Sequence, residues 1–175
     1  ETNLEPEKRP GFISWWDYGF WAIDIGEHPT VADNFQFGYQ IAGNFIASQS
    51  EHEAMVLLLY RLIEPEVDRK SESFNGTKDG GEIRTKLLIY LSEENVTKLE
   101  NIISNPDDYI PKKADGSNQD VHPKNAAIRA GKPILMTIEK NDVADLMWEV
   151  EQITGNSIRY YAADTRLMPY SAGNT

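Results

Sequence analysis

The sequence predicts an α/β fold, in which a small mixed sheet is surrounded by helices within a single compact domain. Segments with strand-like and helix-like patterns alternate along the chain, as they do where helices pack on a sheet. The chain has 175 residues, of which 40% are hydrophobic and 26% charged. That size and composition are usual for one folded domain with its own core.

Four short segments are predicted to be strands, because each is a run of aliphatic, β-branched or aromatic residues next to polar residues, glycine or proline. They are residues 12–14, 86–91, 133–138 and 157–162. Two longer polar segments between them, residues 71–82 and 104–126, are predicted to be loops.

Helices are predicted where apolar residues recur every three or four positions. The first is a buried helical turn that ends at Gly26. Its apolar residues are Phe20, Trp21, Ile23 and Ile25. The second begins at Asn34 and places three aromatic or aliphatic side chains on one face, Phe37, Ile41 and Phe45.

Three further helices are indicated by capping residues as well as by apolar stripes. Ser50 and Glu53 form a capping-box pattern before a helix that ends at Pro65. Ser92 is expected to cap the next helix. The last covers residues 142–154 and ends at Gly155.

Charge and composition exclude several kinds of function. The net charge is −11, which would repel a phosphate backbone, so no nucleic-acid partner is expected. There is no cysteine, which excludes disulfides and thiol chemistry, and the three histidines are too far apart to suggest a zinc site. The first ten residues, rich in Glu, Lys and Pro, are expected to be a tether (1–10), with a globular domain over 11–175.

The run Trp15-Trp16-Asp17-Tyr18-Gly19 is the most unusual feature of the sequence. One interpretation is structural: two core tryptophans beside a helix-capping Asp17. The other starts from hydrogen bonding, because an indole N–H only donates, a carboxylate only accepts, and a hydroxyl does both. Two Trp and one Asp that converge on one point would therefore bind a single Ser or Thr hydroxyl and reject ligands that lack it.

This run is identical to the W-W-D-Y-G signature of the oligosaccharyltransferase catalytic subunit, and the chain resembles that family beyond the five residues. The similarity covers roughly residues 12–60. It includes Val31, Asp33 and Asn34, and the segments 40–42 and 47–48. Because the chain is short and a helix follows Asn34, it is more similar to archaeal members than to eukaryotic or bacterial ones.

The resemblance implies a specific function. The enzyme transfers an oligosaccharide from a lipid-linked donor to Asn in Asn-X-Ser/Thr. Trp15, Trp16 and Asp17 would bind the hydroxyl of the Ser or Thr, and Tyr18 and Gly19 would shape the turn that presents them. The expected partner of this chain is therefore an acceptor polypeptide.

The resemblance also implies what lies outside this chain. In the family the catalytic carboxylates and a divalent metal, Mn or Mg, belong to a multi-helix membrane part that also binds the lipid-linked oligosaccharide. This chain would then be the C-terminal, extracytoplasmic domain of a multi-pass membrane protein. It would hold no catalytic or metal-binding residue and would be inactive alone.

The family has a second motif, carried on a kinked helix near the first, and residues 142–154 are the candidate. Met147 and Val150 approximate one form of that motif, and Asp142 and Asp145 offer the acidic start of another. The alternative is an ordinary amphipathic helix whose apolar stripe packs in the core and whose N-cap is Asp142.

Two other classes of function remain open at this level. A carbohydrate-binding module could use Trp15 and Trp16 as a stacking platform. A carboxylate hydrolase could use Asp17 with Glu27 or Asp33.

Overall fold

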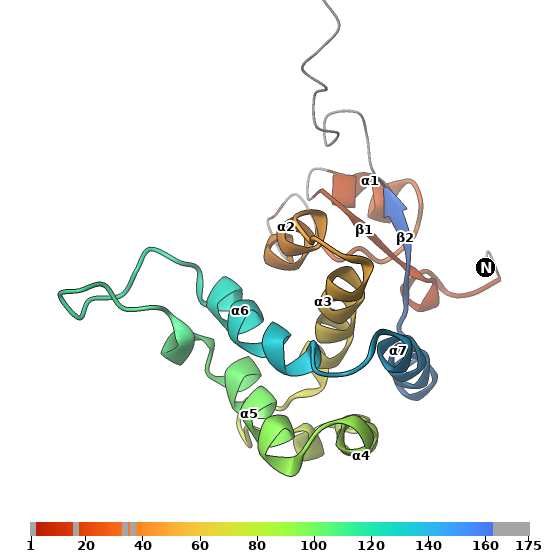
Figure 1. Cartoon of the computed structure of the whole chain (residues 1–175). Coiled ribbons are helices and arrows are strands. Elements are labelled where there is room, and N and C mark those ends of the chain that lie inside the picture. Colours follow the sequence, from red (N-terminus) through yellow and green to blue (C-terminus); the bar gives the residue numbers. More distant parts are fainter. Residues whose placement is uncertain (1–2, 16–17, 33–34, 36–37, 163–175) are drawn as a thin grey trace, which may run out of the picture.

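The computed structural model of the chain describes residues 3–15, 18–32, 35 and 38–162 (Figure 1). Two short strands lie with α1 and α2 at one end of the molecule, and the longer helices α3 to α7 form the rest. The predicted α/β class and single compact domain are confirmed. Helices contribute far more residues than strands.

The core is built around α3 (Glu51–Ile63), which contacts α2 (Tyr39–Ile46), α6 (Pro123–Leu135) and α7 (Lys140–Thr154). The buried residues of α7, Val143, Leu146 and Val150, are spaced by three and four, so they form one apolar stripe. The fully buried residues of α3 are Val56, Leu57, Leu59 and Ile63.

The capping predictions for two helices are confirmed. The Ser50 Oγ accepts a hydrogen bond from the Glu53 N–H (3.1 Å) at the start of α3. The Ser92 Oγ accepts one from the Asn95 N–H (3.2 Å) at the start of α5 (Glu93–Ser104). The last predicted helix begins two residues earlier than expected, with Glu139 at its N-cap, so the prediction of Asp142 as N-cap is wrong.

The strands β1 (Gly11–Ser14) and β2 (Ile158–Ala162) confirm the first and last predicted strands. They pair in parallel, with Gly11 opposite Ile158 and Ser14 opposite Ala162. The sheet of the described residues is thus a parallel pair and not the mixed sheet that was predicted.

The two middle strand predictions are wrong, because one segment is helical and the other is the end of a helix followed by a turn. Residues 86–91 lie in and just after α4 (Gly80–Tyr90), where Ile83 and Leu87 are buried four residues apart against the neighbouring helices. Residues 133–138 include the last turn of α6 and the turn after it. Pro133 is exposed in the final turn of α6, close to the end of the helix.

Both predicted loops contain more regular structure than expected. Residues 71–82 include the 3-10 helix η4 (Phe74–Gly76) and the start of α4, and Phe74 is fully buried. Residues 104–126 include η5 (Pro106–Tyr109) and the first turn of α6. Two further 3-10 helices, η1 (Pro6–Lys8) and η3 (Glu64–Glu66), complete the described elements.

Among the residues that the structure describes, no helix is long and apolar enough to cross a membrane.

Candidate functional site

The described residues of the W-W-D-Y-G run, Trp15, Tyr18 and Gly19, lie between the end of β1 and the first residue of α1 (Gly19–Asp24). Trp15 is exposed just after the strand, Tyr18 is the half-buried N-cap of α1, and Gly19 is buried as its first residue. The Tyr18 N–H donates to the Trp15 carbonyl (3.0 Å), which closes the turn tightly. Trp16 and Asp17 lie outside the described residues, so the convergence of the three side chains stays a prediction.

Backbone pairing on both sides of β1 holds this turn in place. The Phe12 N–H donates to the Pro29 carbonyl (2.7 Å), and the Val31 N–H donates to the Phe12 carbonyl (2.8 Å). The segment that leads to Asp33 and Asn34 therefore runs beside the strand that leads to the W-W-D-Y-G run. Asp33 and Asn34 themselves lie outside the described residues, as does Phe37 of the predicted second helix.

Aromatic rings stabilise the same strand pair. The Phe12 ring packs on Tyr160 of β2 with ring centroids 5.3 Å apart, and His28 meets Tyr160 edge-on at 5.5 Å. The His28 Nδ1 lies 2.8 Å from the Pro10 carbonyl oxygen. This cluster fixes β1 and the returning segment relative to β2.

The prediction that the helical turn ending at Gly26 is buried is wrong. The turn exists as α1, but its apolar side chains are exposed, with Trp21 at 59% and Ile25 at 66%. A six-residue helix that lies against a four-residue strand can bury only its inner side. The exposed apolar side chains before, within and directly after α1 are Trp15, Phe20, Trp21, Ile23 and Ile25.

The second-motif candidates are not brought to this turn. The helix that carries them, α7, precedes β2, and the first residue of β2, Ile158, pairs with Gly11 at the start of β1. Trp15 follows the last residue of β1, at the opposite end of the strand pair. Val150 is fully buried in the core, and Met147 is half-buried against it. Asp142 is half-buried and Asp145 is exposed. These positions fit the amphipathic-helix alternative, and their role in recognition stays untested.

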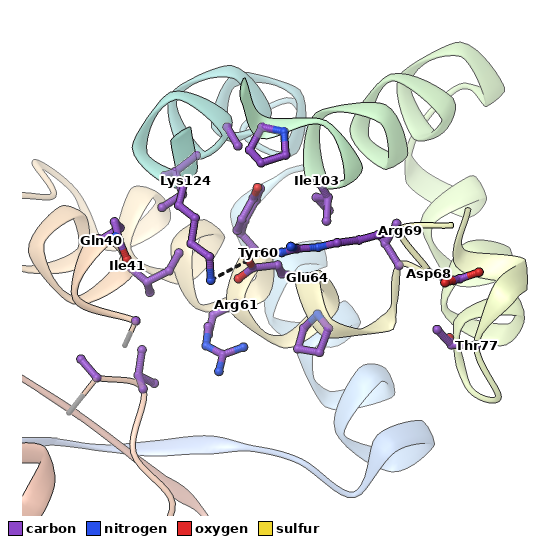
Figure 2. Close-up of a pocket in the computed structure, with 18 of the residues that line it drawn as sticks. Gln40, Ile41, Tyr60, Arg61, Glu64, Asp68, Arg69, Thr77, Ile103 and Lys124 are labelled. Atoms are coloured by element: carbon purple, nitrogen blue, oxygen red, sulfur yellow. Dashed lines mark ion pairs between the residues drawn. The ribbon is translucent and has the colours of Figure 1, made fainter. Parts of the chain in front are cut away.

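A groove of about 720 Å³, which the sequence reasoning did not find, lies between α2, the end of α3, the start of α6 and the segment that follows η3 (Figure 2). Apolar residues of its lining include Ile41, Tyr60, Ile103 and Ile128. The charged residues of its lining are Arg61, Glu64, Asp68, Arg69, Lys70 and Lys124. Five of them lie within residues 61–70, and only the fold brings Lys124 of α6 to the same groove.

The groove is polar at several points along its wall. Lys124 Nζ lies 3.6 Å from the Glu64 carboxylate. Burial raises the pKa of the Tyr60 hydroxyl, the negative charge of Glu64 adds to the shift, and Arg69 opposes it. Tyr60 therefore keeps its proton and can donate a hydrogen bond at any physiological pH. Gln40 is almost fully buried, and its Nε2 lies 3.2 Å from His122 Nδ1.

No group of three or more His, Asp or Glu close enough to hold a metal ion occurs among the residues that the structure describes. Four acidic residues lie close together in the sequence around the run: Asp17, Asp24, Glu27 and Asp33. Two of them, Asp17 and Asp33, lie outside the described part of the chain.

The chain shares sequence with enzymes that transfer oligosaccharides to protein, all of them archaeal. It is 37% identical over 65 residues to dolichyl-phosphooligosaccharide-protein glycotransferase 2 of Archaeoglobus fulgidus, a match that covers 36% of this chain and 11% of that protein. It is 39% identical over 57 residues to glycotransferase 1 of the same organism, which covers 31% and 10%. The third relative is dolichyl-monophosphooligosaccharide–protein glycotransferase AglB of Haloferax volcanii, 38% identical over 53 residues, which covers 30% and 5%.

The predicted family resemblance is thus confirmed over about a third of the chain: its homologues are archaeal oligosaccharyltransferases. The matched part spans only about a tenth, or less, of the length of these curated relatives. No protein-family model matches the chain, and no solved structure does.

Proposed function

We propose that this chain is the C-terminal acceptor-recognition domain of an oligosaccharyltransferase. The whole enzyme transfers an oligosaccharide from a lipid-linked donor to Asn in Asn-X-Ser/Thr, and this domain reads the hydroxyl of the Ser or Thr. The observation that carries the proposal is the W-W-D-Y-G sequence, whose Trp15 is exposed after β1, in a chain whose homologues are named as oligosaccharide–protein transferases.

The described geometry supports this role for the turn. A residue that binds a partner must be accessible, and Trp15 is exposed although it directly follows the buried strand residue Ser14. The turn is closed by a backbone hydrogen bond and fixed by the strand pair, so its side chains can be presented with little loss of conformational entropy on binding. The indoles of Trp15 and Trp16 donate to the acceptor hydroxyl, and Asp17 accepts from it.

The apolar surface around the turn supports contact with a further partner. Exposed apolar patches near a site mark interaction surfaces more often than isolated exposed residues do. In this proposal the α1 surface packs against the membrane part of the enzyme, on the extracytoplasmic side. That part supplies the catalytic carboxylates, the divalent metal (Mn or Mg) and the binding site for the lipid-linked oligosaccharide, and the chain of residues 1–10 tethers the domain to it. The isolated chain is inactive.

A carbohydrate-binding module is the second candidate, favoured by the exposure of Trp15 (36%) and Trp21 (59%) on neighbouring turns. Exposed indole faces stack on sugar rings, and such a module would bind free glycan without any peptide.

The two candidates are separated by NMR titration of the indole N–H signals of the chain. The ligands are two peptides at millimolar concentration that differ only at one residue, Asn-Ala-Thr and Asn-Ala-Val, and a neutral oligosaccharide. We expect the signals of Trp15 and Trp16 to shift with the Thr peptide alone, because only its hydroxyl satisfies both donor and acceptor groups. Trp148, an exposed residue of α7, serves as an internal reporter that should not move.

The matched variants are Asp17→Asn and Asp24→Asn. Each removes one negative charge, but Asp24 is exposed at the last position of α1, outside the W-W-D-Y-G run. Asp17→Asn should abolish the shifts caused by the Thr peptide, and Asp24→Asn should preserve them. Equal shifts with both peptides would contradict hydroxyl reading, and shifts with the oligosaccharide alone would favour the carbohydrate-binding module.

A further inference from the structure

The groove between α2, α3 and α6 is electrostatically unlike the rest of the molecule. Four of its charged lining residues are basic and two are acidic, in a chain whose net charge is −11. Three of the basic residues come from separate elements: Arg61 from α3, Arg69 from the segment after η3, and Lys124 from α6. A basic concavity on an acidic domain concentrates anions locally.

The two acidic residues of the groove already have partners within the protein. Glu64 pairs with Lys124 across the groove. Asp68 accepts hydrogen bonds from the Ser71 hydroxyl (2.8 Å) and from the N–H groups of Lys70 and Ser71 (both 3.2 Å). These bonds lower the pKa of Asp68, so its carboxylate stays ionised and bound within its own loop.

Arg61 and Arg69 have no such partner. Neither guanidinium makes a hydrogen bond or an ion pair with another residue in the described part of the chain. Figure 2 shows Arg69 extending from the η3 side of the groove toward Tyr60 and Glu64, whereas the Arg61 side chain extends from α3 in another direction. A guanidinium presents a planar fork of N–H donors that matches the oxygens of a carboxylate or a phosphate.

The size and the lining of the groove indicate more than a bare ion. A volume of about 720 Å³ lies within the range of about 300–1,000 Å³ that is typical of small-molecule sites. Apolar side chains such as Ile41 and Ile128 line it beside hydroxyl and amide groups of Tyr60, Thr77 and Gln40. A sugar ring offers both kinds of surface, C–H faces for the apolar residues and hydroxyls for the polar ones.

We propose that this groove binds a small saccharide that carries an oxyanion, either a carboxylate or a phosphate monoester. Arg61 and Arg69 bind the oxyanion, and Tyr60 and Gln40 bind ring hydroxyls. The site is separate from the acceptor turn, because Trp15, Tyr18 and Gly19 do not line the groove.

Isothermal titration calorimetry of the 175-residue chain at low salt tests this site. The probes are glucuronic acid and glucose 6-phosphate, with glucose, inorganic phosphate and the peptide Asp-Ala-Asp for comparison. We expect saturable binding of at least one of the two sugar acids. Arg61→Gln and Arg69→Gln should each weaken it by about tenfold, the loss expected when one charge-assisted contact is removed. Arg129→Gln makes the same charge change on an exposed position of α6 outside the groove and should leave binding unchanged.

Several outcomes would overturn the proposal. They are no saturable binding of either sugar acid, equal affinity for glucose, equal affinity for inorganic phosphate, or tighter binding of the peptide than of both sugar acids. An equal loss of affinity in Arg129→Gln would show that binding depends on the overall charge of the chain and not on the groove. Because Arg69 is exposed in a loop segment, Arg69→Gln keeps the test valid even if Arg61→Gln unfolds, which circular dichroism would show.

Discussion

The strand pair that carries the W-W-D-Y-G turn and the helical part around α3 are held together in different ways. In the helical part, whole stripes of aliphatic side chains are fully buried, and α3 is in contact with α7. In the strand part, four residues of β1 pair with β2, and an aromatic cluster of Phe12, His28 and Tyr160 supports them. The helix that follows the turn exposes its apolar residues.

This difference teaches where stability and recognition are located in the molecule. Global stability follows buried apolar area, so it resides in the helices. A surface that binds a partner must leave apolar and polar groups accessible, so it is built on a thin, locally supported element. The strand part should therefore open or deform without unfolding the helical part.

The largest effect is expected from a cavity in the helical part. Leu146 of α7 is fully buried, so Leu146→Ala should lower the free energy of unfolding by about 3 kcal/mol, from the lost apolar contact and the cavity that remains. Chemical denaturation followed by circular dichroism measures this. Ile89→Ala, at a position of α4 that is 64% exposed, is the control and should change stability by less than about 0.5 kcal/mol. A similar loss in both variants would contradict the claim that global stability resides in the buried side chains of the helical part.

The sequence was sufficient where local signals agreed with one another. Ser50 and Ser92 each combine a capping side chain with an apolar stripe, and the helices begin there as expected. Residues 86–91 and 133–138 are short apolar runs without alternation, and such runs fit a buried strand or a buried helix equally well. Tertiary contacts with neighbouring helices decide in favour of helix for both.

The two candidate sites also differ in how well the local sequence predicts them. The W-W-D-Y-G run is contiguous, so its residues can be recognised from the sequence alone. Arg61 and Arg69 are close in sequence, but Lys124 joins them only through the packing of α3 and α6, and no motif in the sequence marks the three as a set. The exposure of α1 could not be predicted either, because an apolar helix face does not show whether the domain itself or a partner covers it.

A smaller and more local effect is expected at Gly38, the N-cap of α2. Its φ is +73°, and an added Cβ would lie 1.7 Å from the Val31 carbonyl oxygen, so Gly38→Ala must displace the segment that runs beside β1. We expect a loss of about 1–2 kcal/mol, with faster hydrogen exchange at the Phe12 and Val31 amides and unchanged exchange in α3.

Gly43 provides the matched control for Gly38 within the same helix. No atom lies within 4 Å of a Cβ added at Gly43, so Gly43→Ala should stabilise the protein by about 0.5–1 kcal/mol through higher helix propensity. If Gly38→Ala instead speeds exchange throughout α3 and α7, the strand part and the helical part unfold together as one cooperative unit.

The smallest effect is a pH dependence that arises in the helical part, at Glu66 of η3. Burial raises the pKa of this carboxyl, nearby Asp79 raises it further, and a hydrogen bond from Thr77 partly opposes them. A raised pKa in the folded state means that folding favours the protonated form, so this contribution is fully present below about pH 4.5. It is lost as the pH rises through the raised value.

Thermal unfolding from pH 4 to 7 should therefore show a flatter decline in Tm for Glu66→Gln than for the wild type, whereas Glu72→Gln, in the exposed loop before η4, should follow the wild type. Because the helical part determines global unfolding, even this small titration should be visible in Tm. An identical dependence of Tm on pH for the wild type and Glu66→Gln would mean that the end of α3 opens before the helices unfold.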